Sequence, residues 1–95
     1  MYKNIKEIRD DIDKLDRDII ELISKRAKLV HKLPDFKSDI SEINDEERIE
    51  EIIQNVRKTS LENDLSPNIS NDIYDIMIKE MIEIEIKEFK NKSVF

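Results

Sequence analysis

A row of isoleucine and leucine residues, spaced alternately four and three apart, runs through the first third of the sequence. This spacing places side chains on one face of an α-helix and is typical of a face that packs against other helices. The row comprises Ile8, Ile12, Leu15, Ile19, Leu22, Leu29 and Leu33. It predicts one helix over about residues 4 to 33. Pro34 should end or kink this helix, because proline lacks a backbone donor and clashes with the preceding turn.

Capping signals predict two further helices. Asn44, followed three residues later by Glu47, fits a capping box. Ser66-Pro67 joins an N-cap residue to the residue favoured at the first helical position, and this third helix should reach about Lys90. One face of the second helix carries Ile49, Ile52, Ile53 and Val56. We therefore expect an all-α fold with a long first helix and two shorter ones.

Chain length bears on assembly. A chain of 95 residues makes a single domain, here residues 1–95, and buries only a modest fraction of its surface by itself. A second copy would cover the apolar row. We therefore expect a homodimer.

Composition excludes several classes of function. The 17 Lys and Arg residues are outnumbered by 23 Asp and Glu residues, and the net charge of −6 argues against a nucleic-acid partner. There is no cysteine and a single histidine, His31, which lies off the apolar row and is expected at the surface. Thiolate nucleophiles, zinc fingers and histidine triads are therefore not expected. Chemistry must use carboxylates, lysine, arginine or hydroxyl groups, with no metal.

Two absences bear on cofactors and location. Because the chain has no glycine, phosphate-cradling loops and dinucleotide fingerprints are not expected, and no cofactor is predicted. The first residues lack an apolar signal core, and no apolar run approaches the roughly 20 residues that span a bilayer. We expect a cytoplasmic protein without a membrane partner.

Two charged residues interrupt apolar rows. Arg26 occupies the position between Leu22 and Leu29 where the row should be apolar. A guanidinium there is costly unless it is paired or binds a ligand. Arg26 could pair with an acid such as Glu85, extend past its neighbours to water, or bind an anion. Glu85 itself lies in a stripe of the third helix with Tyr74, Ile78, Met81 and Phe89.

Helix geometry separates Arg26 from another arginine, Arg9. The two are 17 residues apart, which at about 1.5 Å per residue puts their Cα atoms about 25 Å apart on one helix. One small dicarboxylate cannot bridge them within a protomer. Antiparallel first helices of two copies would bring Arg9 of one chain beside Arg26 of the other.

Short segments along the chain form one larger pattern. They are Ile8-Arg9, Ile12-Asp13, Leu15-Asp16, Ile19-Ile20, Leu22-Ile23, Lys25-Arg26, Phe36-Lys37, Asp45 and Glu47-Arg48-Ile49. Together they resemble the all-helical chorismate mutase family, over about residues 5 to 89. The resemblance implies a three-helix protomer intertwined with a second copy, two equivalent sites per dimer, and conversion of chorismate to prephenate in the shikimate pathway of aromatic amino acid biosynthesis.

The resemblance also implies roles for charged residues. Arg9 would reach into the site of the second copy, whereas Arg26, Lys37 and Arg48 would serve the site of their own chain. Arg9 and Arg26 match the family's carboxylate-binding arginines, and Lys37 matches its ether-oxygen lysine. Glu85 matches a Gln or Glu near the ether oxygen, to which it would donate when protonated.

The rest of the implied site leaves the substrate open. Arg48 and Asp45 would order the pocket wall and the hydroxyl side of the substrate. Ile49 stands where many mutases have a Glu that contacts the substrate hydroxyl, and Met81 stands where many have a Ser. Related isochorismate pyruvate lyases, which give salicylate and pyruvate, resemble this chain at Ile49 and at Phe36-Lys37. A mutase for the 4-amino analogue and a helical dimer that serves only as an interaction module are further alternatives.

Overall fold

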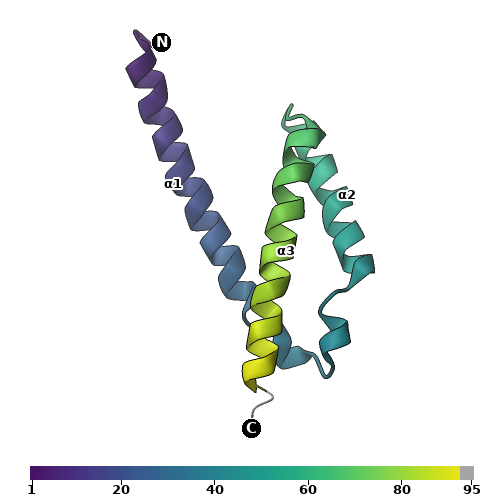
Figure 1. Cartoon of the computed structure of the whole chain (residues 1–95). Coiled ribbons are helices and arrows are strands. Elements are labelled where there is room, and N and C mark those ends of the chain that lie inside the picture. The colour runs from purple at the N-terminus through teal and green to yellow at the C-terminus, as the bar shows by residue number, and fades with distance from the viewer. Residues whose placement is uncertain (93–95) are drawn as a thin grey trace.

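The computed structural model describes residues 1–92, which form three α-helices and two short 3-10 helices (Figure 1). The elements are α1 (Ile5–Val30), η1 (Leu33–Phe36), η2 (Ile40–Glu42), α2 (Glu46–Glu62) and α3 (Pro67–Lys92). Helices α2 and α3 lie side by side, whereas α1 diverges from α3 toward its N-terminus (Figure 1). No strand occurs among residues 1–92. The predicted all-α class and the start of the third helix at Pro67 are confirmed. The expectation of a shorter third helix is wrong, since α1 and α3 each have 26 residues.

Helix α1 begins where its cap predicts and ends earlier than expected. The side chain of Asn4 accepts a hydrogen bond from the N–H of Glu7 at 3.0 Å and caps the first turn. The predicted end near residue 33 is wrong, because α1 stops at Val30. Pro34 explains the difference, since a proline lacks the N–H that would bond to the carbonyl four residues earlier, and its ring clashes there. The chain continues as η1 instead, with Pro34 completely buried.

The predicted cap of α2 is also wrong, by one residue. Asp45, not Asn44, is the N-cap, and its carboxylate accepts from the N–H of Arg48 at 3.1 Å. Asn and Asp are about equally good N-caps. The buried side chain of Ile43, which ends η2, fixes the path of the chain into α2. The cap position therefore depends on tertiary packing.

The core of the single chain is small. Its buried apolar side chains come from the end of α1, the segment after it and α3: Val30, Pro34, Ile43, Ile78 and Met81. Near the turn between α2 and α3, the hydroxyls of Ser60 and Ser70 share a buried hydrogen bond of 2.6 Å. Asp64, within this turn, adopts a left-handed conformation with φ of 55°, which Asp tolerates better than most residues. These contacts close α2 against α3.

The apolar row of α1 remains largely exposed in the single chain. Leu15 is 59% exposed, Ile19 51% and Leu22 63%. A row of exposed aliphatic side chains of this length marks an interaction surface. None of the helices in residues 1–92 combines the length and apolar content that a membrane crossing requires.

Candidate active site

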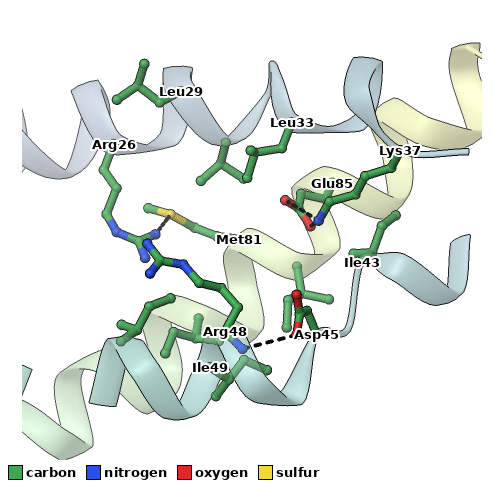
Figure 2. A pocket seen from close by; sticks show the side chains of 14 residues that line it. Arg26, Leu29, Leu33, Lys37, Ile43, Asp45, Arg48, Ile49, Met81 and Glu85 are labelled. Carbon is green, nitrogen blue, oxygen red and sulfur yellow. Dashed lines mark hydrogen bonds and ion pairs between the residues drawn. The ribbon is translucent and has the colours of Figure 1, made fainter. Parts of the chain in front are cut away.

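A pocket of about 430 Å³ lies where the C-terminal end of α1, the segment after it, α2 and α3 meet (Figure 2). Among residues 1–92, its ionisable lining residues are Arg26, Lys37, Asp45, Arg48 and Glu85. The rest of the wall is mostly aliphatic. Three cationic groups thus face two carboxylates, so the pocket carries an excess of positive charge in a chain whose net charge is −6.

Lys37 and Glu85 form the buried ion pair of the pocket. Nζ of Lys37 lies 3.4 Å from both carboxylate oxygens of Glu85. The Glu85 side chain is 6% exposed and that of Lys37 is 20% exposed. The pair forms because Lys37 follows η1 with an extended backbone and Glu85 lies on the face of α3 that packs against this turn. A buried carboxylate needs such a partner.

Arg26 has no carboxylate partner in the part of the chain that the structure describes. Its Nη1 lies 2.6 Å from Sδ of Met81, and its guanidinium carbon lies 5.9 Å from the centre of the Tyr74 ring. Among residues 1–92, no carboxylate is within ion-pair distance of Arg26. The proposed pairing of Arg26 with Glu85 is therefore wrong. Because a thioether is a weak acceptor, the guanidinium keeps donors for an anionic ligand.

Arg48 faces the same end of the pocket from α2. Figure 2 shows the guanidinium groups of Arg26 and Arg48 extending toward one another. Nη1 of Arg48 is 2.7 Å from a carboxylate oxygen of Glu51, at a pair whose side chains are more than half exposed. Such exposed pairs contribute little stability, roughly 0 to 1 kcal/mol. An anionic ligand can therefore recruit Arg48 at small cost.

The structure brings most of the predicted site together. Of the eight predicted site residues, all within residues 1–92, seven line this pocket: Arg26, Lys37, Asp45, Arg48, Ile49, Met81 and Glu85. Asp45 also caps α2, so one of its oxygens is already engaged. Arg9 lies elsewhere, exposed on the N-terminal half of α1, by helix rise about 25 Å from Arg26. The pocket of a single chain thus contains every predicted site residue except Arg9.

Comparison with known proteins decides the family. The sequence model of the family described as chorismate mutase type II matches residues 8–86. The chain belongs to this family. A protein named chorismate mutase, from Methanocaldococcus jannaschii, is 31% identical over 97 residues, which cover 98% of this chain and 98% of that protein. The family expected from the sequence pattern is confirmed, and so is the expected isomerase class.

Some residues around this chorismate mutase type II pocket were not predicted. Tyr74 lies in the apolar stripe of α3, but nothing in the stripe indicated that it would face Arg26. Val30, the last residue of α1, and Ile43, which follows η2, are both buried and also line the pocket. His31 is exposed, as expected, and its Nδ1 lies 2.9 Å from a carboxylate oxygen of Glu88.

Within residues 1–92, no group of three or more His, Cys, Asp or Glu residues could hold a metal ion.

Proposed function

We propose that this chain converts chorismate to prephenate in the pocket of Arg26, Lys37 and Glu85, completed by Arg9 of a second copy. The observation that carries the proposal is the guanidinium of Arg26, which faces the pocket with no carboxylate partner among residues 1–92. A pocket of about 430 Å³ suits a small ligand. The excess of cationic groups suits a dicarboxylate.

The reaction is an intramolecular rearrangement, so the protein must supply shape and charge. The enolpyruvyl arm has to fold over the ring, and the ether oxygen gains negative charge as its bond to carbon breaks. We assign Arg26 and the second copy's Arg9 to the substrate carboxylates. Lys37, and Glu85 in its protonated form, donate to the ether oxygen, since the ammonium and carboxyl groups meet at one place in the pocket.

The free energy from these contacts is large enough to explain the rate gain of a mutase. A rate gain of about a millionfold corresponds to roughly 8 kcal/mol. Removal of one preorganised donor from a developing anion typically costs about 3 kcal/mol. Two or three such contacts, together with restriction of the arm, therefore account for catalysis without a cofactor.

The homodimer rests on two features of the single chain. The side chains of the apolar row of α1 are each about half exposed. Arg9 lies in the N-terminal half of α1, away from the pocket. An antiparallel pair of α1 helices would cover the row and carry Arg9 of each copy toward the pocket of the other. The same antiparallel dimer thus covers the apolar row and completes the pocket with Arg9.

Product identification tests the function. Purified protein is incubated separately with chorismate and with isochorismate, and the products are separated by chromatography. Prephenate from chorismate is the expected result. Salicylate and pyruvate from isochorismate, without prephenate, would instead establish the lyase alternative, which Ile49 in the pocket wall favours. No turnover of either compound would favour the interaction module.

A further inference from the structure

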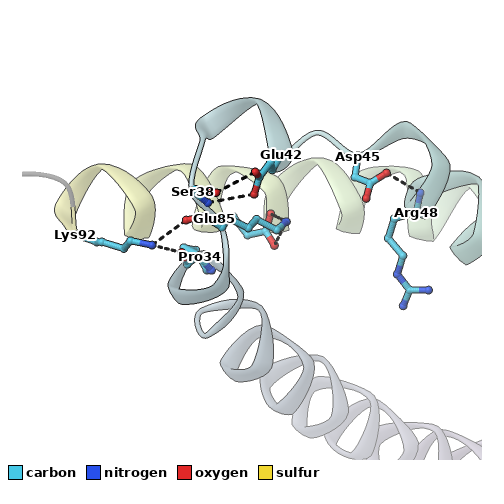
Figure 3. A network of polar contacts seen from close by, with 8 residues as sticks. Pro34, Ser38, Glu42, Asp45, Arg48, Glu85 and Lys92 are labelled. Carbon is cyan, nitrogen blue, oxygen red and sulfur yellow. Dashed lines mark hydrogen bonds and ion pairs between the residues drawn. The ribbon is translucent and has the colours of Figure 1, made fainter.

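Lys92, on the last turn of α3, contacts the turn that carries Lys37 (Figure 3). Its ammonium group donates hydrogen bonds to the main-chain carbonyl of Pro34 and, at 3.0 Å, to that of Lys37. The N–H of Lys37 donates to the same Pro34 carbonyl at 3.2 Å. One side chain thus binds the main chain at both ends of this turn.

The turn determines where the ammonium group of Lys37 can lie. A lysine head stands on a flexible four-carbon stem, so its position depends on how firmly its main chain is held. Lys37 leaves η1 with φ of −114° and ψ of 136° and reaches Glu85 from there. A displacement of about 1 Å in a catalytic group can lower the rate by about 100-fold. The restraint on the main chain therefore bears on catalysis.

Lys92 belongs to a stripe of α3 that contacts the end of α1 and the turn after it. Glu85, Glu88 and Lys92 are spaced three and four residues apart, which places them on one face of the helix. Glu85 pairs with the side chain of Lys37 and Glu88 with that of His31. Lys92 differs from both because it binds carbonyl oxygens. Its Nζ also lies 5.2 Å from the centre of the Phe89 ring, which helps to fix its direction.

We propose that Lys92 is a positioning residue for Lys37. By binding the carbonyls of Pro34 and Lys37, it holds the turn so that the Lys37 ammonium meets the ether oxygen of the substrate. The proposal rests on the mutase function proposed above. Lys92 is not among the described residues that line the pocket, so it acts on the reaction through Lys37.

Kinetics of two substitutions test this role. Lys92→Met keeps the chain length and the contact with Phe89 but removes the donors, whereas Lys92→Arg keeps donors. We expect Lys92→Met to lower kcat about tenfold or more and to change KM less than about threefold, because the Arg26 clamp is untouched. Lys92→Arg should recover most of the loss. The matched control is Lys87→Met, an exposed lysine on the same helix, which should behave as the wild type.

All variants are assayed at a temperature at which circular dichroism shows them fully folded, so that a loss of stability cannot imitate a loss of positioning. An unchanged kcat in Lys92→Met would overturn the proposal. So would an Arg variant as impaired as the Met variant, since both would then reflect lost packing.

A double substitution tests whether Lys92 acts through Lys37. Lys37→Gln keeps an amide donor beside Glu85 and removes the ammonium group. In this background Lys92→Met should cause little further loss of kcat, because the group that it positions is gone. A further loss of about tenfold would show independent action and reject the positioning role.

Amide hydrogen exchange separates this proposal from the proposed function. The N–H of Lys37, bonded to the Pro34 carbonyl, should exchange about tenfold faster in Lys92→Met, and at the wild-type rate in Lys92→Arg and Lys87→Met. Unchanged exchange in Lys92→Met, with an active wild type, rejects the Lys92 proposal alone. A wild-type chain that does not turn over chorismate rejects the proposed function, and with it the role of Lys92 in the reaction.

Discussion

Nζ of Lys37 lies 3.4 Å from both carboxylate oxygens of Glu85, although the two residues are 48 positions apart in sequence. The acid is almost completely buried, and the base is its ion-pair partner. The pair therefore joins the segment after α1 to α3 at the point where a ligand would need donors.

Hydrogen-bond donation from position 85 should support turnover. An amide side chain can donate to the ether oxygen of the substrate, whereas an aliphatic side chain cannot. Glu85→Gln should therefore retain much more of the wild-type kcat than Glu85→Leu, which should lose about 100-fold or more. The measurement is kcat with chorismate, with Glu88→Gln as the control because Glu88 pairs with His31 outside the pocket. Equal losses in Glu85→Gln and Glu85→Leu would remove donation by Glu85 from the mechanism.

A shared site should allow two inactive variants to restore each other. Arg9→Ala and Arg26→Ala homodimers should each be nearly inactive, because every site lacks one carboxylate clamp. After the two are unfolded together and refolded in equal amounts, about half of the dimers are mixed, each with one intact site. Activity should then reach about a quarter of the wild-type value. If mixing restores nothing above the separate variants, the two arginines serve one site within a single chain.

The apolar row of α1 should hold the dimer together. Leu15→Glu places a charge in the row and should give monomers that have lost nearly all activity, since a buried unpaired charge is strongly unfavourable. Ser24→Glu adds the same charge on the opposite face of α1 and should leave the dimer intact. Analytical ultracentrifugation at micromolar concentration distinguishes the two. A folded, active wild-type monomer under these conditions would contradict both the dimer and the shared site.

Position 49 should influence the choice of substrate. Ile49→Glu introduces a carboxylate that can accept from the substrate hydroxyl, and it should raise mutase activity relative to any lyase activity. Ile49→Leu preserves an aliphatic wall of similar volume and should leave the ratio unchanged. The measured quantity is kcat/KM for chorismate divided by that for isochorismate. An identical ratio in all three proteins would mean that specificity is set elsewhere in the pocket.

The features that could be predicted from the sequence are those with local or periodic signals. Proline acts within one helical turn, so Pro34 and Pro67 indicated an end and a beginning that the structure bears out to within a few residues. The spacing of the apolar row predicted the first helix, although with an end about three residues too late, and it revealed the unusual position of Arg26. The resemblance to the family then predicted seven residues, from separate segments of the chain, that line the pocket.

The features that escaped prediction depend on contacts between distant residues. No local pattern distinguishes a carboxylate from a thioether and an aromatic ring as the neighbour of Arg26, which contacts Met81 and Tyr74. Lys92 resembles any other lysine near a helix end until the turn at Pro34 folds against it. The choice of Asp45 over Asn44 as the cap of α2 likewise follows from the burial of Ile43, because Asn and Asp are about equally good caps.

In the proposed dimer, the divergence of α1 from the rest of the chain would make ligand binding and assembly reciprocal. The N-terminal half of α1 has its apolar residues exposed in the single chain, and isolated helices shorter than about 12 to 15 residues are marginal in water. In the proposed dimer, association orders the segment that delivers Arg9. A substrate held by Arg9 of one copy and Arg26 of the other would bind more tightly to the dimer than to the single chain. By linkage, the substrate would then raise the association constant of the dimer by the same factor. Turnover per chain should accordingly fall on dilution, and saturating ligand should delay that fall to lower concentrations.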